Sequence, residues 1–229
     1  MRGVEAGPVT TDKSAAPHEK AGPATAGFYY PNKIGRIILL ATEEVMGRNG
    51  VNAVLNLARL RHLVNNYPAN NFDRQFRFED VGGIQQALEE MYGPRGARGL
   101  ALRAGRACFK YGIKEFGPVL GISDLAFRLL PIGMKMKVGI EVFAEMFNKF
   151  SDQVVRLGED ESHFIWTIER CPVCWGRRTS EPCCYLAVGI LQEGAIWVSG
   201  GKNFSVEETT CVAKGDATCT ILIGKRPLD

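Results

Sequence analysis

Three cysteines and one glutamate near the end of the chain have the types and the spacing of a metal site. They are Cys184, Glu208, Cys211 and Cys219. Zn²⁺ accepts thiolate and carboxylate ligands and imposes no geometric preference of its own, so these four groups can complete a tetrahedron around it. A completed tetrahedron leaves no position for a substrate. We therefore expect a structural zinc site rather than a catalytic one.

A hairpin and a helix must position these ligands. Residues 206–211 have a strand pattern, and the turn Lys214-Gly215-Asp216 sends the chain back toward Cys219. Cys184 stands before an apolar run at residues 185–198 that is typical of a helix. A metal ion would fix this helix to the hairpin. The alternative is that the cysteines are merely small buried apolar side chains, but the neighbouring acids and tight turn favour a metal.

The sequence Cys-Pro-Val-Cys at residues 171–174 is the main competitor for the metal. A pair of cysteines two residues apart is a common half of a zinc site. Cys171 and Cys174 with Cys211 and Cys219 would make an all-sulfur tetrahedron. A third interpretation is a redox-active pair, or an iron–sulfur cluster that includes Cys183. Residue types alone leave these alternatives open.

The C-terminal pattern resembles the 4-vinyl reductase domain family. The resemblance rests on Cys184-x4-Gly189, on Gly194, on Gly200-Gly201, and on Val206-Glu207-Glu208-Thr209-x-Cys211-x-Ala213-x-Gly215-Asp216-x-x-Cys219. That family is named after a bacteriochlorophyll-pathway protein and is shared with the sensor modules of phenol-responsive bacterial activators. The resemblance covers approximately residues 95–225 and is strongest at the C-terminal end.

This resemblance implies a fold, a cofactor and a pocket. In the sensor members, a zinc ion held by Cys, Glu, Cys and Cys lies beside a buried pocket for an aromatic effector, and these ligands fall on Cys184, Glu208, Cys211 and Cys219. The implied fold is an α/β ligand-binding fold similar to that of vesicle-tethering (TRAPP) subunits. The sensor members continue into an ATPase and a DNA-binding domain, whereas this sequence ends at Asp229.

Hydrophobic periodicity predicts an α/β (α+β) fold in which helices pack on a small antiparallel sheet. Helices are expected at residues 34–45, 52–63, 84–91, 98–116, 136–150 and 185–198, and strands at 153–157, 162–170, 204–209 and 218–223. Residues 69–79 are expected to form a loop, and both faces of strand 162–170 are expected to be largely buried. We expect a disordered tail at residues 1–27, a helical extension at 28–94 and a ligand-binding domain at 95–229.

Composition limits the functional classes. The 229 residues are 45% hydrophobic and carry a net charge of +3, which is too small to indicate nucleic-acid binding. No apolar run approaches the length of a membrane span. Seven cysteines without a secretory signal at residues 1–27 are typical of a reducing cytoplasm, so we expect a cytoplasmic protein.

Aromatic residues are dense in the family-like portion, and we expect them to enclose a hydrophobic or aromatic small molecule beside the zinc site. The predicted lining is Phe109, Phe143, Phe147, Phe164, Trp166, Tyr185 and Trp197. The spacing of apolar residues from Met136 to Phe150 suits either a core helix or a homodimer contact.

Motifs that indicate catalysis are scarce. The only histidines are His18, His62 and His163, and no dinucleotide-binding, phosphate-binding or nucleophile-elbow motif is present. A small-molecule-binding module is therefore the first hypothesis. The second, which rests on resemblance alone, is a bacteriochlorophyll-pathway factor that reduces a vinyl group or carries a tetrapyrrole. The third is a dimeric tethering protein.

Overall fold

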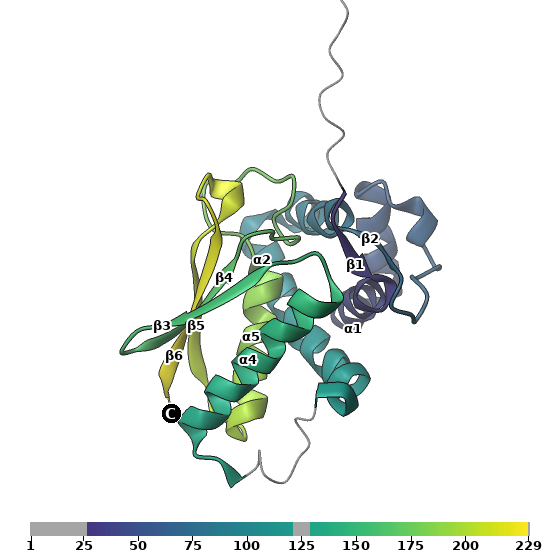
Figure 1. Cartoon of the computed structure of the whole chain (residues 1–229). Helices are drawn as coiled ribbons and strands as arrows, with labels where there is room; N and C mark the ends of the chain where they lie inside the picture. Colours follow the sequence, from purple (N-terminus) through teal and green to yellow (C-terminus); the bar gives the residue numbers. More distant parts are fainter. Residues whose placement is uncertain (1–26, 121–128, 229) are drawn as a thin grey trace, which may run out of the picture.

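The computed structural model describes residues 27–120 and 129–228, with the backbone alone at residues 118–120. The predicted disordered tail lies outside the described residues except for Gly27. Helices and two small antiparallel sheets make up the described chain, so the predicted α+β fold is confirmed. Figure 1 shows the larger sheet on one side of the molecule, with helices packed beside it.

The larger sheet has four antiparallel strands in the order β3-β4-β6-β5. Their bounds are Val155–Glu159 (β3), His163–Ile168 (β4), Phe204–Thr210 (β5) and Cys219–Pro227 (β6). In β4, Phe164, Trp166 and Ile168 are buried, whereas the alternating residues are partly exposed. The prediction that both faces of this strand are largely buried holds for one face only. Helices pack on one face of the sheet, so alternate residues remain in contact with solvent.

The separate helices expected at the N-terminal end are present, and each pair is joined into one longer element through a single non-helical glycine. Helix α1 is Asn32–Leu57, with a kink at Gly47, and helix α2 is Phe78–Leu120, with a kink at Gly93. Both glycines have positive φ (74° and 69°), a conformation that glycine adopts without steric cost and that interrupts a helix. The helix expected to reach residue 63 ends at Leu57, and a short 3-10 turn, Arg61–Leu63, follows.

A two-stranded sheet stands where residues 69–79 were expected to form a loop. Strand β1 is Tyr29–Pro31 and pairs in antiparallel with β2, Arg74–Arg77. Within β2 only Phe76 is buried. The loop prediction was wrong because this strand is defined by pairing with a distant segment and has almost no apolar pattern of its own.

Helix α4 is Ile132–Phe150 and helix α5 is Tyr185–Ser199. Helices α2 and α5 cross at two glycines. A Cβ atom at Gly105 would lie 2.2 Å from the carbonyl oxygen of Leu186, and one at Gly189 would lie 2.2 Å from that of Leu102. Only glycine allows the two backbones to approach so closely.

One hydrophobic core joins the N-terminal helices to the sheet. It includes Leu39 of α1, Leu88 of α2 and Ile221 of β6, all at most 1% exposed. The boundary expected at residue 95 falls inside α2, next to its kink. Among the described residues, no helix combines the length and the apolar character needed to cross a membrane.

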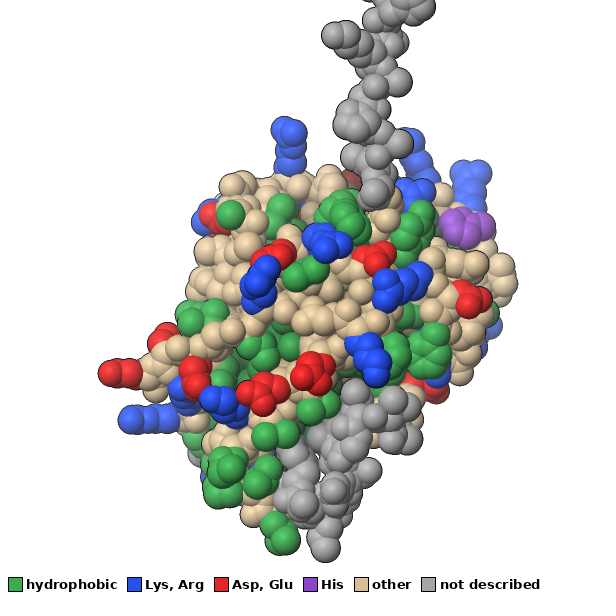
Figure 2. Space-filling model, viewed as in Figure 1, with side chains coloured by type: hydrophobic (Ala, Val, Ile, Leu, Met, Phe, Trp, Pro, Cys, Tyr) green, Lys and Arg blue, Asp and Glu red, His purple; other side chains and the backbone are tan. Residues whose placement is uncertain are grey.

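Charged side chains of both signs are interspersed over the face shown in Figure 2. Some form ion pairs, such as Glu159 with Lys137 at 2.7 Å and with Lys225 at 2.9 Å. Neither sign of charge dominates the face that Figure 2 shows.

Candidate functional site

Six of the seven cysteines converge on one buried cluster between the sheet, α5 and the loop that follows β4. They are Cys171, Cys174, Cys183, Cys184, Cys211 and Cys219, and each is at most 5% exposed. Cys184 immediately precedes α5, Cys211 follows β5, and Cys219 begins β6. The hairpin and the helix predicted from the sequence therefore do bring their cysteines together.

Cys184, Cys211 and Cys219 form a nearly equilateral triangle of sulfur atoms. The Sγ–Sγ distances are 3.8 Å for Cys184 to Cys211, 3.8 Å for Cys184 to Cys219 and 3.9 Å for Cys211 to Cys219. A zinc ion with Zn–S bonds of about 2.3 Å in a tetrahedron requires sulfur atoms about 3.8 Å apart. The triangle thus has the dimensions of three corners of a zinc site.

Glu208 supplies the fourth corner. Its carboxylate oxygen and the three sulfur atoms all lie within 4.8 Å of one another. The side chain is buried, Oε2 accepts a 2.7 Å hydrogen bond from the backbone N–H of Cys184, and Oε1 has no hydrogen-bond partner among the described residues. Burial raises the pKa of Glu208 to about 8. A buried carboxylate oxygen without a partner is costly, and a cation at the centre of the cluster would provide one.

Backbone geometry in the hairpin holds two of these cysteines. The N–H of Cys211 donates to Oδ2 of Asp216 at 2.8 Å, and the N–H of Val212 donates to Sγ of Cys219 at 3.3 Å. Gly215 has φ of +109°, which closes the turn between Cys211 and Cys219. N–H donors to sulfur stabilise a thiolate, the form that binds metals.

The Cys-Pro-Val-Cys segment contacts the same cluster on another side. Sγ of Cys171 lies 3.4 Å from Sγ of Cys184, and Sγ of Cys174 lies 3.4 Å from Sγ of Cys219. The structure therefore groups this pair with Cys184 and Cys219, not with Cys211 and Cys219 as in the alternative set considered from the sequence. Cys183 contacts Cys211 at 3.8 Å but belongs to neither set of four.

An iron–sulfur cubane fits these distances poorly. In such a cluster each thiolate binds a different iron, which separates the ligand sulfur atoms farther than a single ion does. Here the sulfur atoms lie close enough to share one ion.

An apolar cavity of about 110 Å³ lies between α1, α2, α4, α5 and the sheet. Five of the seven aromatic residues predicted to line a pocket do line it, namely Phe109, Phe143, Phe147, Trp166 and Trp197. Phe164 and Tyr185 do not. Lys225 covers the ring of Phe164, and Tyr185 packs against the guanidinium of Arg98.

The cavity lining includes residues that sequence reasoning did not select. Ile34, Ile37 and Ile38 of α1 line it, and the periodic apolar face of that helix was the available signal. No charged residue and no histidine is among the described lining residues. Its main polar feature is a hydrogen bond from the hydroxyl of Tyr30 to Oε1 of Gln153. Burial raises the pKa of Tyr30 well above its usual value, so this hydroxyl stays neutral.

The cysteine cluster and the cavity share structural elements. Helix α5 starts after Cys184 and lines the cavity with Leu186, Ile190 and Trp197. Val173, which stands between Cys171 and Cys174, lines it as well. Any ion held by the cluster would therefore stabilise one wall of the cavity.

Residues 164–225 match the family model described as V4R domain. This segment contains the cysteines of the cluster and Glu208. This segment of the chain is V4R-like. The family resemblance predicted from the sequence is thereby confirmed. No curated protein matches the chain.

The similarity of this chain to solved structures extends beyond the segment that matches the V4R model. An H-NOX protein from S. oneidensis in the Fe(II)NO ligation state has 14% sequence identity and a TM-score of 0.52, and the match covers 85% of this chain and 99% of that one. An Fe(II) unliganded H-NOX protein from K. algicida has 12% identity and a TM-score of 0.52, with 85% and 95% covered. At this identity the likeness concerns the fold, and it includes the N-terminal helices, because residues 95–229 alone are too short to supply it.

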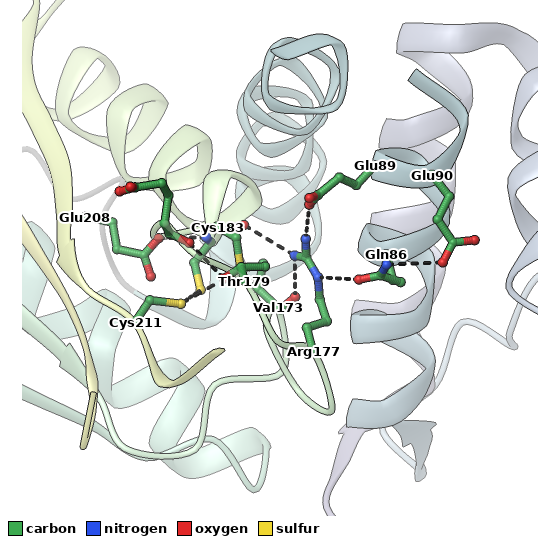
Figure 3. A network of polar contacts seen from close by, with 11 residues as sticks. Gln86, Glu89, Glu90, Val173, Arg177, Thr179, Cys183, Glu208 and Cys211 are labelled. Carbon is green, nitrogen blue, oxygen red and sulfur yellow. Dashed lines mark hydrogen bonds and ion pairs between the residues drawn. The ribbon is translucent and has the colours of Figure 1, made fainter. Parts of the chain in front are cut away.

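A buried arginine ties the V4R domain to helix α2. Arg177, whose side chain is 4% exposed, contacts Oε2 of Glu89 at 2.5 Å and approaches the carbonyl oxygens of Val173 and Cys183 at 3.5 Å (Figure 3). It also reaches Gln86, one turn before Glu89. The sequence analysis missed Arg177 because its partners lie far away in the chain. The contacts fix the cysteine-bearing loop against α2.

Proposed function

We propose that this chain is a small-molecule-binding module. Its cavity holds an uncharged, largely apolar ligand, and a structural zinc ion bound by Cys184, Glu208, Cys211 and Cys219 stabilises one wall. The observation that carries the proposal is the apolar cavity beside a cluster of side chains that could ligate a metal, joined to it through α5. The V4R match and the H-NOX-like fold support a ligand-binding role.

The lining defines the chemistry of the ligand. Aromatic and aliphatic side chains surround the cavity, and the described lining residues include no charged group that could pair with an ionised ligand. Burying an unpaired charge there would be very costly. The amide of Gln153 and the hydroxyl of Tyr30 offer hydrogen bonds to a single polar group. Apolar cavities of about 150 Å³ are known to bind benzene, so a neutral monocyclic aromatic such as a phenol suits the available volume.

A thermal-unfolding panel tests this function. Phenol and cresols should raise the melting temperature of the zinc-loaded protein, because a ligand that binds only the folded state stabilises it, by about 2.7 kcal/mol at a hundredfold excess over Kd. For a chain of this size this corresponds to a rise of about 5–10 °C. Benzoate, which has a similar ring but a negative charge, is the matched control and should give no rise. The proposal is wrong if benzoate stabilises the protein as much as phenol, or if no neutral aromatic does.

A tetrapyrrole is the second candidate ligand. The resemblance to a bacteriochlorophyll-pathway family and the Fe(II) states in the names of the similar H-NOX structures favour it. Haem iron takes an axial ligand from His, Cys thiolate, Met or Tyr. The described lining has no histidine, burial raises the pKa of Cys108 and keeps it a thiol, and the Tyr30 hydroxyl is bonded to Gln153. Only the thioethers of Met136 and Met146 remain as lining groups that could bind the iron. The lining residues therefore fit an iron tetrapyrrole less well than a neutral aromatic.

Absorption spectroscopy separates the two candidates. If the cavity binds small aromatics, iron protoporphyrin added to the protein should keep the absorption spectrum of the free compound. A shifted Soret band that saturates at one equivalent would establish the tetrapyrrole instead. No vinyl reduction is proposed, since the chain offers no recognisable hydride source.

A cytoplasmic location and a homodimer remain predictions of the same proposal. Met136, Met146 and Phe147 of α4 are buried in the chain's own core, so the apolar stripe of this helix does not itself require a second copy. Light scattering on the purified protein measures the mass. A dimer that binds no small aromatic and no tetrapyrrole would favour the tethering function.

A further inference from the structure

We propose that the cysteine cluster binds two metal ions that share Cys184 and Cys219 as bridging thiolates. The first ion takes Cys184, Glu208, Cys211 and Cys219, and the second takes Cys171, Cys174, Cys184 and Cys219. Divalent ions of the zinc class suit both sets, because soft thiolates dominate the donors. This inference deepens the metal-binding part of the proposed function and rests on it.

The geometry shows two complete sets of four ligands, not one. Within each set all four ligand atoms lie within 4.8 Å of one another, and every ligand is buried. The sets have only Cys184 and Cys219 in common, and these two sulfur atoms are 3.8 Å apart. A thiolate has lone pairs to spare after binding one ion, so a shared pair of sulfur atoms can form the common edge of two tetrahedra.

One ion leaves part of the cluster without a role. An ion in the first set leaves the buried sulfur atoms of Cys171 and Cys174 unused, although each lies 3.4 Å from a bridging sulfur. An ion in the second set leaves Glu208 Oε1 buried without a partner among the described residues. Two ions use every member of both sets.

The competing arrangement has a single ion in the first set. Cys171 and Cys174 would then stay protonated and donate S–H···S hydrogen bonds to the thiolates of Cys184 and Cys219, which the 3.4 Å distances also permit. The two arrangements differ in the number of ions per chain. They also differ in whether any sulfur atom bridges two ions.

The metal content of the full chain, prepared without oxygen or chelator, tests the inference. Native mass spectrometry should find two zinc ions per chain. After replacement of zinc by ¹¹³Cd²⁺, the NMR spectrum should show two cadmium resonances split by mutual coupling through the shared sulfur atoms. One ion per chain, or two resonances without coupling, overturns the inference but leaves the proposed structural zinc intact. No bound ion overturns both.

A double variant locates the second ion. Cys171→Ser with Cys174→Ser removes two ligands of the second set and none of the first, so the protein should retain one ion and lose the cadmium coupling. Cys108→Ser is the matched control, because Cys108 is buried on the cavity wall and belongs to neither set, and it should retain two ions. A double variant that still binds two ions contradicts the inference. The wild-type spectrum decides the question without any variant should the double variant fail to fold.

Discussion

The backbone N–H of Cys184 donates a 2.7 Å hydrogen bond to Oε2 of Glu208, and both residues belong to one set of candidate metal ligands. Cys184 precedes α5 and Glu208 lies on β5, so this contact joins the start of a cavity-lining helix to the sheet. An ion bound by both residues would strengthen that junction. Metal binding and the shape of the cavity are therefore linked through α5.

Loss of a hairpin ligand should destabilise the whole fold. Cys211→Ala and Cys219→Ala each remove a proposed zinc ligand and leave the other ligands of the proposed site incomplete. Structural zinc contributes about 10–16 kcal/mol to the folding of zinc-finger peptides. The larger core here supplies additional stability, so we expect a loss of several kcal/mol or failure to fold. Urea denaturation with metal analysis measures both effects.

Two further variants should lose less metal and less stability than these cysteine variants. Glu208→Gln keeps the shape of the side chain and a neutral oxygen ligand, so it should weaken zinc retention less than loss of a cysteine. Cys108→Ala should leave the metal content unchanged, since Cys108 is not among the cluster ligands. Full metal content and normal stability in Cys211→Ala would show that the first set does not bind zinc.

The close crossing of α2 and α5 should not tolerate a methyl group. In Gly105→Ala the added carbon would meet the carbonyl oxygen of Leu186 at 2.2 Å, so the helices must move apart at a cost of about 1–3 kcal/mol. Gly99 lies in the same helix with open space around it, and Gly99→Ala should stabilise the protein by up to about 1 kcal/mol. Chemical denaturation of both variants checks the difference. Equal effects would contradict the crossing geometry.

Arg177 should contribute far more to the stability of the fold than its neighbour Arg178. Arg177→Met leaves the carboxylate of Glu89 without its buried partner and removes the contacts with the cysteine-bearing loop. Breaking a buried ion pair costs about 3–5 kcal/mol, and the partial exposure of Glu89 places the expected loss near the lower end. Arg178→Met alters an exposed arginine and should change stability by less than about 0.5 kcal/mol. Thermal denaturation compares the two, and similar losses would refute the role of Arg177.

Filling the cavity should separate ligand binding from stability. Gly112 lies in α2 on the cavity wall, and a Cβ atom there meets nothing within 4 Å. Gly112→Leu should therefore stabilise the helix by about 1 kcal/mol and occupy the space of the ligand. We expect a higher melting temperature in the absence of ligand and no further rise with phenol. A variant that still responds to phenol would place the binding site elsewhere.

Local patterns predicted much of this structure. Strand alternation, the Lys214-Gly215-Asp216 turn and the helix after Cys184 are encoded by neighbouring residues, so the hairpin that carries Cys211 and Cys219 could be anticipated. The choice of Cys184 and Glu208 as the other two ligands rested on the family resemblance. The contacts between distant segments could not be anticipated from the sequence. The path of the loop after β4 decides that Cys171 meets Cys184, and the spacing of the cysteines carries no information about that path.

The aromatic residues predicted to line the cavity show the same limit of prediction from local sequence patterns. Phe164 and Trp166 share one face of β4, yet only Trp166 reaches the cavity, because Phe164 lies farther along the strand under Lys225. Tyr185 is in the first turn of α5, and the rotation of that helix directs it toward Arg98. Periodicity assigns a residue to a face, but packing decides whether that face borders the cavity at that point.

Tryptophan fluorescence offers the most direct test of ligand binding in the cavity. Trp166 and Trp197 line the cavity, whereas Trp175 packs against Phe28 and Phe78, so a Trp175→Phe variant reports from the cavity alone. This variant is titrated with a nitrophenol at a pH below the pKa of that phenol, so that the ligand stays neutral. The tryptophan emission should be quenched along a saturable curve with one site per chain. Addition of Gly112→Leu to the same variant should abolish that saturable quenching. Quenching that rises linearly without saturation, or that is identical in both proteins, would contradict the account.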